Sequence, residues 1–233
     1  MEQHVSERPD QLPVWTKEYA ADEGVPTTNR LDPSGSVVKF FELVEQSNSS
    51  GNRKVIDLGC GGGRNALYMA SRGYCVTAVD FVESALQRTE QIAVQHDCFG
   101  SITCIKSRLG YDLPFIDHYF DLAVDCVTSV SLSKEELSTF EAEVRRILRP
   151  SGLFMSYVMA DDDGYLADRC NEDGYATIEQ TGLVDRCFSE ALLRRIYKDW
   201  NILRLEKKEK QDHFYNKVYT RRLWWLVARP TRS

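Results

Sequence analysis

Lys54-Val-Ile-Asp-Leu-Gly-Cys-Gly-Gly-Gly-Arg-Asn-Ala66 is the stretch that decides the fold. Its apolar run of Val55, Ile56 and Leu58 predicts a short buried strand. The glycines that follow allow a sharp turn, and we expect a helix to open near Asn65. A strand, a glycine loop and a helix N-terminus in this order build a nucleotide-binding site, because the helix start offers unpaired backbone N–H groups and a positive dipole end.

Two phosphate-binding motifs do not fit this glycine loop. A dinucleotide fingerprint that starts at Gly59 needs its third glycine at position 64, where the chain has Arg64. A phosphate loop needs Gly-Lys followed by Ser or Thr, which the stretch lacks. The loop therefore serves another ligand, with a purely structural tight turn as the alternative.

The run Asp57-x-Gly59-x-Gly61-x-Gly63 resembles motif I of the class I S-adenosylmethionine-dependent methyltransferases. The resemblance continues at Thr77-Ala-Val-Asp80, an apolar strand that ends in an acid. It extends through Leu113-Pro-Phe115, Phe120-Asp-Leu-Ala-Val124 and Glu143 to Leu153, which are similar to the family's later core motifs. Together these segments cover roughly residues 50 to 160, in the family's order.

This resemblance implies S-adenosylmethionine as the cofactor and a set of residues that bind it. In the family, the acid at the end of the second strand, here Asp80, binds the ribose hydroxyls; a helix N-cap is its structural alternative. The sequence departs from the family after the third strand, where Ser107-Arg-Leu109 offers no acid, so adenine recognition falls to backbone atoms or to Asp112. The residues that the resemblance assigns to the cofactor are Asp57, Gly59, Cys60, Gly61, Gly63, Asp80, Phe81, Asp125 and Cys126.

Composition is that of a soluble globular protein, with 42% hydrophobic and 27% charged residues in 233. No apolar run is long enough for a transmembrane helix, and the first ten residues have no apolar core of a signal peptide, so we expect a cytoplasmic protein without membrane contact. The seven cysteines include no C-x-x-C pair, which predicts free thiols and no metal site.

The charge is unevenly spread along the chain. Residues 191–233 carry twelve Lys and Arg against four acids, a net charge of +8, while the remainder carries −14. Such a basic segment attracts an anionic substrate or nucleic acid, or it forms a solvated face on the closing strands. We favour the solvated face.

Strands and helices alternate through residue 159, which predicts an α/β fold with helices on both faces of a parallel sheet. The full expectation is a Rossmann-like, doubly wound, seven-stranded sheet, mostly parallel with an antiparallel C-terminal hairpin strand. Residues 1–50 form an arm and lid helices, and residues 51–233 form the methyltransferase domain with a short substrate cap at about 160–187. Asp161-Asp-Asp163 is interpreted as surface loop, and Trp224-Trp225 as strand core.

Candidates for the acceptor side come from three regions. Trp15 and Tyr19 are lid residues or anchors that pack the N-terminal arm onto the core. Asp125 and Thr128 follow the fourth strand, at the sheet edge where ligands bind; a loop residue satisfied by nearby N–H groups is the alternative for Asp125. Because methyl transfer requires a general base only for a protonated acceptor, the candidates for that role, His213, Tyr165 and Tyr157, are secondary.

Three functions fit the sequence. The first is methyl transfer to an O, N or S atom of a small molecule. The second is methylation of RNA or protein with the help of the basic C-terminal segment; the amino-methylating motif Asn/Asp-Pro-Pro-Tyr is absent after the fourth strand, where Asp125-Cys-Val-Thr128 stands. The third is a non-catalytic partner protein that binds the donor. The acceptor and the oligomeric state are left open.

Overall fold

The computed structural model describes residues 10–20, 30–46, 53–214 and 217–231. Its helices are α1 (Leu12–Ala20), α2 (Gly35–Gln46), α3 (Arg64–Ser71), α4 (Glu83–Gln95), α5 (Lys134–Ile147) and α6 (Glu190–Ile196), with short 3₁₀ turns η1 (Phe99–Ser101), η2 (Ser129–Ser131) and η3 (Ala167–Arg169). Its strands are β1 (Lys54–Leu58), β2 (Cys75–Asp80), β3 (Ile102–Lys106), β4 (Phe120–Cys126), β5 (Leu148–Met159), β6 (Tyr175–Ile178), β7 (Leu183–Arg186), β8 (Trp200–Phe214) and β9 (Lys217–Pro230).

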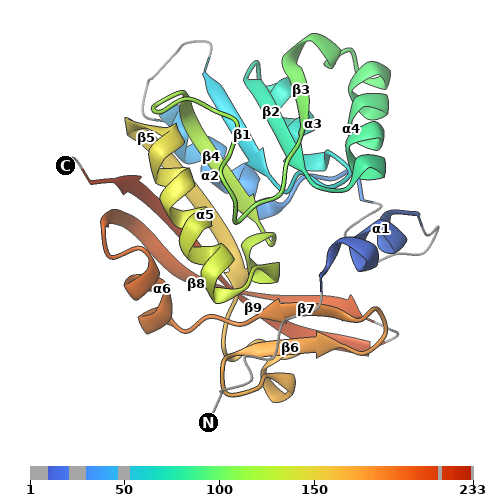
Figure 1. The fold of residues 1–233 in the computed structure, drawn as a ribbon, viewed down its shortest axis with the longest axis vertical. Coiled ribbons are helices and arrows are strands. Elements are labelled where there is room, and N and C mark those ends of the chain that lie inside the picture. Colours follow the sequence, from blue (N-terminus) through green and yellow to red (C-terminus); the bar gives the residue numbers. More distant parts are fainter. Residues whose placement is uncertain (1–9, 21–29, 47–52, 215–216, 232–233) are drawn as a thin grey trace.

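The central sheet has seven strands in the order β3-β2-β1-β4-β5-β9-β8 (Figure 1). Strands β1 to β5 pair in parallel, whereas β9 runs antiparallel to both of its neighbours, β5 and β8. Helices lie on both faces of this sheet. The predicted fold class is therefore confirmed, including the antiparallel strand near the C-terminus.

The strand order reverses between β1 and β4, and this point positions the site. From β1 the chain builds outward through β2 to β3, then crosses back to β4 on the other side of β1. The loops after β1 and β4 consequently diverge at the carboxyl edge of the sheet and leave a crevice between them.

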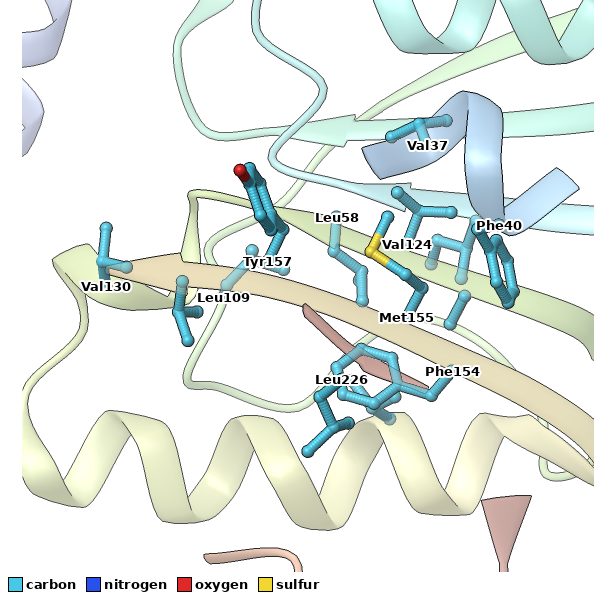
Figure 2. Close-up of a cluster of buried hydrophobic side chains, with 14 of the residues drawn as sticks. Val37, Phe40, Leu58, Leu109, Val124, Val130, Phe154, Met155, Tyr157 and Leu226 are labelled. Carbon is cyan, nitrogen blue, oxygen red and sulfur yellow. The ribbon is translucent and has the colours of Figure 1, made fainter. Parts of the chain in front are cut away.

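The core fills both sides of the sheet. Figure 2 shows Val37 and Phe40 of α2 on one side, and Phe154 and Leu226 facing α5 on the other; all four are 0% exposed. Trp225 of β9 is also 0% exposed, which confirms that the tryptophan pair is strand core.

Local signals explain where the core helices begin. Ser133 accepts a hydrogen bond from the backbone N–H of Glu136, and Glu136 accepts one from the backbone N–H of Ser133, which forms a capping box at the start of α5. Ser189 caps α6 by accepting from the N–H of Leu192. Across the described ranges, no helix combines the length and apolar character that crossing a bilayer requires.

The segment between β5 and α6 forms a cap next to the carboxyl edge. It contains η3 and the two-stranded hairpin of β6 and β7, which lies apart from the central sheet. Asp163 in this segment is 0% exposed, so the interpretation of Asp161–Asp163 as surface loop was wrong for this residue. The physical reason is an ion pair with β9, because the carboxylate of Asp163 accepts from the guanidinium of the buried Arg221.

Candidate functional site

The glycine loop after β1 is fixed on the end of β2. The backbone N–H groups of Gly59 and Cys60 both donate to the carbonyl of Val79, at 2.8 and 2.9 Å. Gly59 and Gly61 have positive φ angles of 76° and 55°, which side chains disfavour. A Cβ atom on Gly59 would lie 2.1 Å from Thr128, and one on Gly61 would lie 2.3 Å from the hydroxyl of Tyr19. Both glycines are therefore required by the backbone and by the side chains packed on the loop.

Asp80 at the end of β2 completes the loop. One of its carboxylate oxygens accepts from the N–H of Gly61 and the other from the N–H of Val82, both at 2.9 Å. Each oxygen keeps a second lone pair, and the residue lines the cavity described below. Burial raises the pKa of Asp80, opposed by the backbone N–H groups of Val82, Gly61 and Phe81. This carboxylate is placed to accept hydrogen bonds from two ligand hydroxyls.

Asp57 lies beneath the loop, is 1% exposed, and does not line the cavity. Its Oδ2 atom is buried without a hydrogen-bond partner among the residues that the structure describes. Burial raises the pKa of Asp57 to about 7; Arg64 opposes this, and the nearby carboxylates of Asp80 and Asp125 add to it. Three acids from the ends of β1, β2 and β4 thus gather at one edge, where a ligand with positive charge would be attracted.

Asp125 at the end of β4 is 0% exposed and faces the protein. It accepts hydrogen bonds from the N–H groups of Thr128 and Ser129 and from the hydroxyls of Ser129 and Ser156. These four donors occupy the carboxylate of Asp125. Its contacts match the alternative interpretation of Asp125, a loop residue satisfied by nearby N–H groups. It holds the turn in which Val127 has a φ of 64°, a strained angle for a β-branched residue. The turn presents Cys126 and Thr128 to the cavity.

A cavity of about 1820 Å³ joins the glycine loop to the cap and to β8 and β9. Helix α1 covers it, with Trp15 and Tyr19 in its lining. The side-chain oxygen of Gln11, next to α1, accepts from the N–H of Val184 in β7, which ties this helix to the cap. Burial raises the pKa of Tyr19 well above the usual value, and Asp80 and Cys60 contribute to the same shift.

Aromatic side chains form part of the cavity lining. Tyr157 of β5 lines it, together with Tyr165 and Phe214, whose rings stack at 5.0 Å between centroids. Burial raises the pKa of Tyr157 to about 12, so its phenol keeps its proton at neutral pH. His213 is exposed on β8 and does not line the cavity. Asp112 is likewise exposed and outside it, whereas Leu109 lines it and is buried.

The structure adds one feature that sequence reasoning missed. The guanidinium of Arg221, 4% exposed, lines the cavity and donates from Nε to both oxygens of Asp163, at 3.0 and 2.8 Å. No local signal separated Asp163 from its two acidic neighbours or Arg221 from the other basic residues of its segment. Asp163 and Arg221 are identified only by the ion pair that they form in the folded chain, since they are 58 residues apart in the sequence.

The basic segment forms ion pairs along the hairpin of β8 and β9. Lys207 pairs with Asp162, Arg222 with Glu209, and Lys210 with Asp212 of the same strand. The positive charge is therefore distributed among acids on a partly exposed surface, as the solvated-face interpretation predicts.

Comparison with known proteins shows which families and relatives this chain is similar to. Residues 55–152 match a methyltransferase domain family. An uncharacterised methyltransferase of Synechocystis is 32% identical over 121 residues, which are 52% of this chain and 54% of that protein. The ubiquinone biosynthesis O-methyltransferase of Pasteurella multocida is 27% identical over 135 residues, 52% of this chain and 56% of that one. The chain thus spans about half the length of these curated relatives.

A solved structure shares the fold at low identity. The 1,6-didemethyltoxoflavin-N1-methyltransferase of Burkholderia thailandensis, with bound 1,6-didemethyltoxoflavin and S-adenosylhomocysteine, superimposes with a TM-score of 0.61 at 18% identity, over 85% of this chain and 79% of that one. The matched segment of the family begins in β1 and ends within β5, so it includes the glycine loop, Asp80 and the turn after β4.

Proposed function

Because this chain belongs to the class I S-adenosylmethionine-dependent methyltransferases, we propose that it transfers a methyl group to an O, N or S atom of a small-molecule acceptor. The observation that carries the proposal is one cavity whose lining joins the glycine loop and Asp80 to aromatic side chains, among them Trp15, Tyr157 and Tyr165. A concave site with apolar and polar side chains in its lining suits a small molecule, and the ion pairing of the basic hairpin leaves RNA with less to bind.

The residues at the sheet edge fit the donor. The cluster of Asp57, Asp80 and Asp125 favours a ligand that carries a sulfonium and an ammonium group. Asp80 would hold the ribose hydroxyls with its remaining lone pairs, and the glycine backbone would support the donor beside Thr128 and Tyr19, whose side chains pack on Gly59 and Gly61. When bound, S-adenosylmethionine supplies a methyl group that its sulfonium has already activated for in-line displacement.

The protein's own contribution is then position and exclusion of water. Trp15 and Tyr19 of α1 cover the loop, and the cap closes the other side. Tyr157, with its pKa raised to about 12, donates a hydrogen bond to the acceptor instead of removing its proton. Of the predicted arm and lid, residues 1–50, we propose α1 as the lid, because α2 packs in the core; we propose residues of about 160–187 as the acceptor cap. We also propose a cytoplasmic location, since the seven free cysteines suit a reducing compartment.

Calorimetric titration with S-adenosylmethionine and S-adenosylhomocysteine tests the donor site. We expect saturable binding by the wild type and a ten- to hundredfold weaker affinity for Asp80→Asn, since hydrogen bonds to a charged group contribute about 1.5–3 kcal/mol. Asp112→Asn is the matched control, because this acid lies outside the cavity. Weaker binding by Asp112→Asn would restore that residue as the adenine contact. Absence of binding in the folded wild type would refute the donor site.

Release of S-adenosylhomocysteine tests turnover. The folded protein, saturated with donor, is incubated with a panel of small phenols, amines and thiols, and the methylated product is identified by mass spectrometry. We expect a methylated product from at least one of these classes. Donor binding without turnover on the whole panel, together with methylation of bulk RNA or protein, would favour a macromolecular acceptor.

A further inference from the structure

A second cavity, of about 680 Å³, lies between α5, α6 and the end of β7. Arg186, the last residue of β7, lines this cavity and does not line the main one. The cavity takes no part in the donor site or in the proposed methyl transfer. Its lining includes the charged side chain of Arg186, which forms no ion pair with the residues that the structure describes.

Arg186 is buried but unpaired. It is 6% exposed, and its Nε atom is buried without a hydrogen-bond partner. Its guanidinium lies 5.1 Å from the ring centroid of Tyr175 and 5.6 Å from that of Phe188. Within the described ranges it forms no ion pair, whereas the other strongly buried arginine, Arg221, has the carboxylate of Asp163. A buried cation normally has a counter-ion, because leaving it alone in a low dielectric is costly.

The acids around the cavity are already engaged or exposed. Asp173 pairs with Lys134, and Glu141 accepts from the indole N–H of Trp200 and pairs with Arg145. The other charged residues in the lining are exposed and of both signs, namely Asp161, Glu172, Asp199, Arg195 and Lys198. Apart from Arg186, the described residues of the lining therefore include five acids and three bases, and Arg186 is the one buried charge among them.

A guanidinium that contacts two aromatic rings presents its N–H groups in its own plane. This planar fork matches the oxygens of a carboxylate or a phosphate group, and the aromatic contacts keep it oriented before a ligand arrives. We propose that this cavity is a second ligand site, which binds a small oxyanion, a carboxylate or phosphate group, on Arg186.

The site borders the acceptor end of the main cavity. Tyr175 lines the main cavity while its ring contacts Arg186, and its hydroxyl donates to the carbonyl of Leu132 at 3.0 Å. The pair of Lys134 and Asp173 lines both cavities. The side chain of Tyr175 would therefore separate an anion bound to Arg186 from the main cavity.

Titration calorimetry of the full chain with sodium phosphate, and separately with sodium acetate, at constant ionic strength tests this site. We expect saturable binding of one molecule per chain for at least one anion, with a Kd on the order of millimolar. Comparison of the two anions shows whether a phosphate or a carboxylate is preferred. Arg186→Gln should weaken this binding at least tenfold. Arg194→Gln is the matched control, because Arg194 is an exposed arginine of α6 that does not line the cavity.

Arg186→Lys is a second variant, which keeps the charge and most of the side chain but lacks the planar fork; we expect severalfold weaker binding. Affinity for S-adenosylhomocysteine should be unchanged in all three variants, which shows that they are folded and that the donor site is intact. Absence of saturable binding of both anions in the wild type overturns the proposal, whatever the variants do. Equal affinity in the wild type and Arg186→Gln also overturns it.

Discussion

Breaking the buried pair of Asp163 and Arg221 should destabilise the protein far more than breaking an exposed pair beside it. The side chains of Asp163 and Arg221 are 0% and 5% exposed. Asp163 also accepts from the backbone N–H groups of Tyr165, Leu166 and Arg222, at 2.9 to 3.1 Å. One carboxylate therefore fixes the start of the cap on β9 by its charge and by three backbone donors.

The magnitude follows from what each substitution leaves behind. Arg221→Met leaves a buried carboxylate without its cation, and Asp163→Asn leaves a buried guanidinium without its anion, so each should cost about 3–5 kcal/mol of unfolding free energy. The double variant leaves neither charge, and its amide oxygen still accepts from part of the backbone donors. We expect it to cost no more than either single variant, and the interaction energy to be at least about 2 kcal/mol.

Urea unfolding followed by tryptophan fluorescence measures the four proteins of this cycle. The control is the neighbouring pair of Asp162 and Lys207, whose side chains are 51% and 33% exposed. The same cycle with Asp162→Asn and Lys207→Met should give less than about 1 kcal/mol. Single-variant costs for Asp163 and Arg221 that add within about 0.5 kcal/mol would refute a buried, mutually dependent pair.

Three further predictions concern the loop and the helix start. Since burial raises the pKa of Asp57 to about 7, donor affinity should increase roughly tenfold from pH 6 to pH 8 as the carboxylate ionises, and calorimetry on Asp57→Asn should show no such change. Gly61→Ala places a Cβ 2.3 Å from the hydroxyl of Tyr19 at a φ of 55°, so thermal unfolding should show a loss of about 1–3 kcal/mol of stability. Adding Tyr19→Ala to this variant removes the steric clash but not the backbone strain, so it should restore only part of the loss. Ser133→Ala removes the cap that accepts from Glu136 and should cost about 1 kcal/mol in urea unfolding.

Each of these three predictions has an outcome that contradicts it. Parallel pH profiles for the wild type and Asp57→Asn would show that Asp57 does not set donor affinity. Full stability in Gly61→Ala would mean that α1 does not pack on the loop as described. Unchanged stability in Ser133→Ala would show that the capping box does not stabilise α5.

The elements predicted best are those whose signals are local. The bounds of β4, Phe120 to Cys126, follow from an apolar run, and the start of α5 follows from Ser133 and Glu136 three residues apart. The sharp turn at the glycines was also predicted from local sequence, because a backbone with positive φ favours glycine at that position.

The sequence by itself determined the order of strands and helices, the glycine loop and the acid that ends β2, because periodicity, caps and turn chemistry act over a few neighbouring residues. Only the tertiary structure decided which charges are buried. Asp125 faces four donors from the loop and β5, and Asp163 pairs with Arg221. Arg186 contacts two aromatic rings and forms no ion pair with the residues that the structure describes. Burial and electrostatic partners depend on residues that are distant in the chain, and no local pattern of side chains encodes those distances.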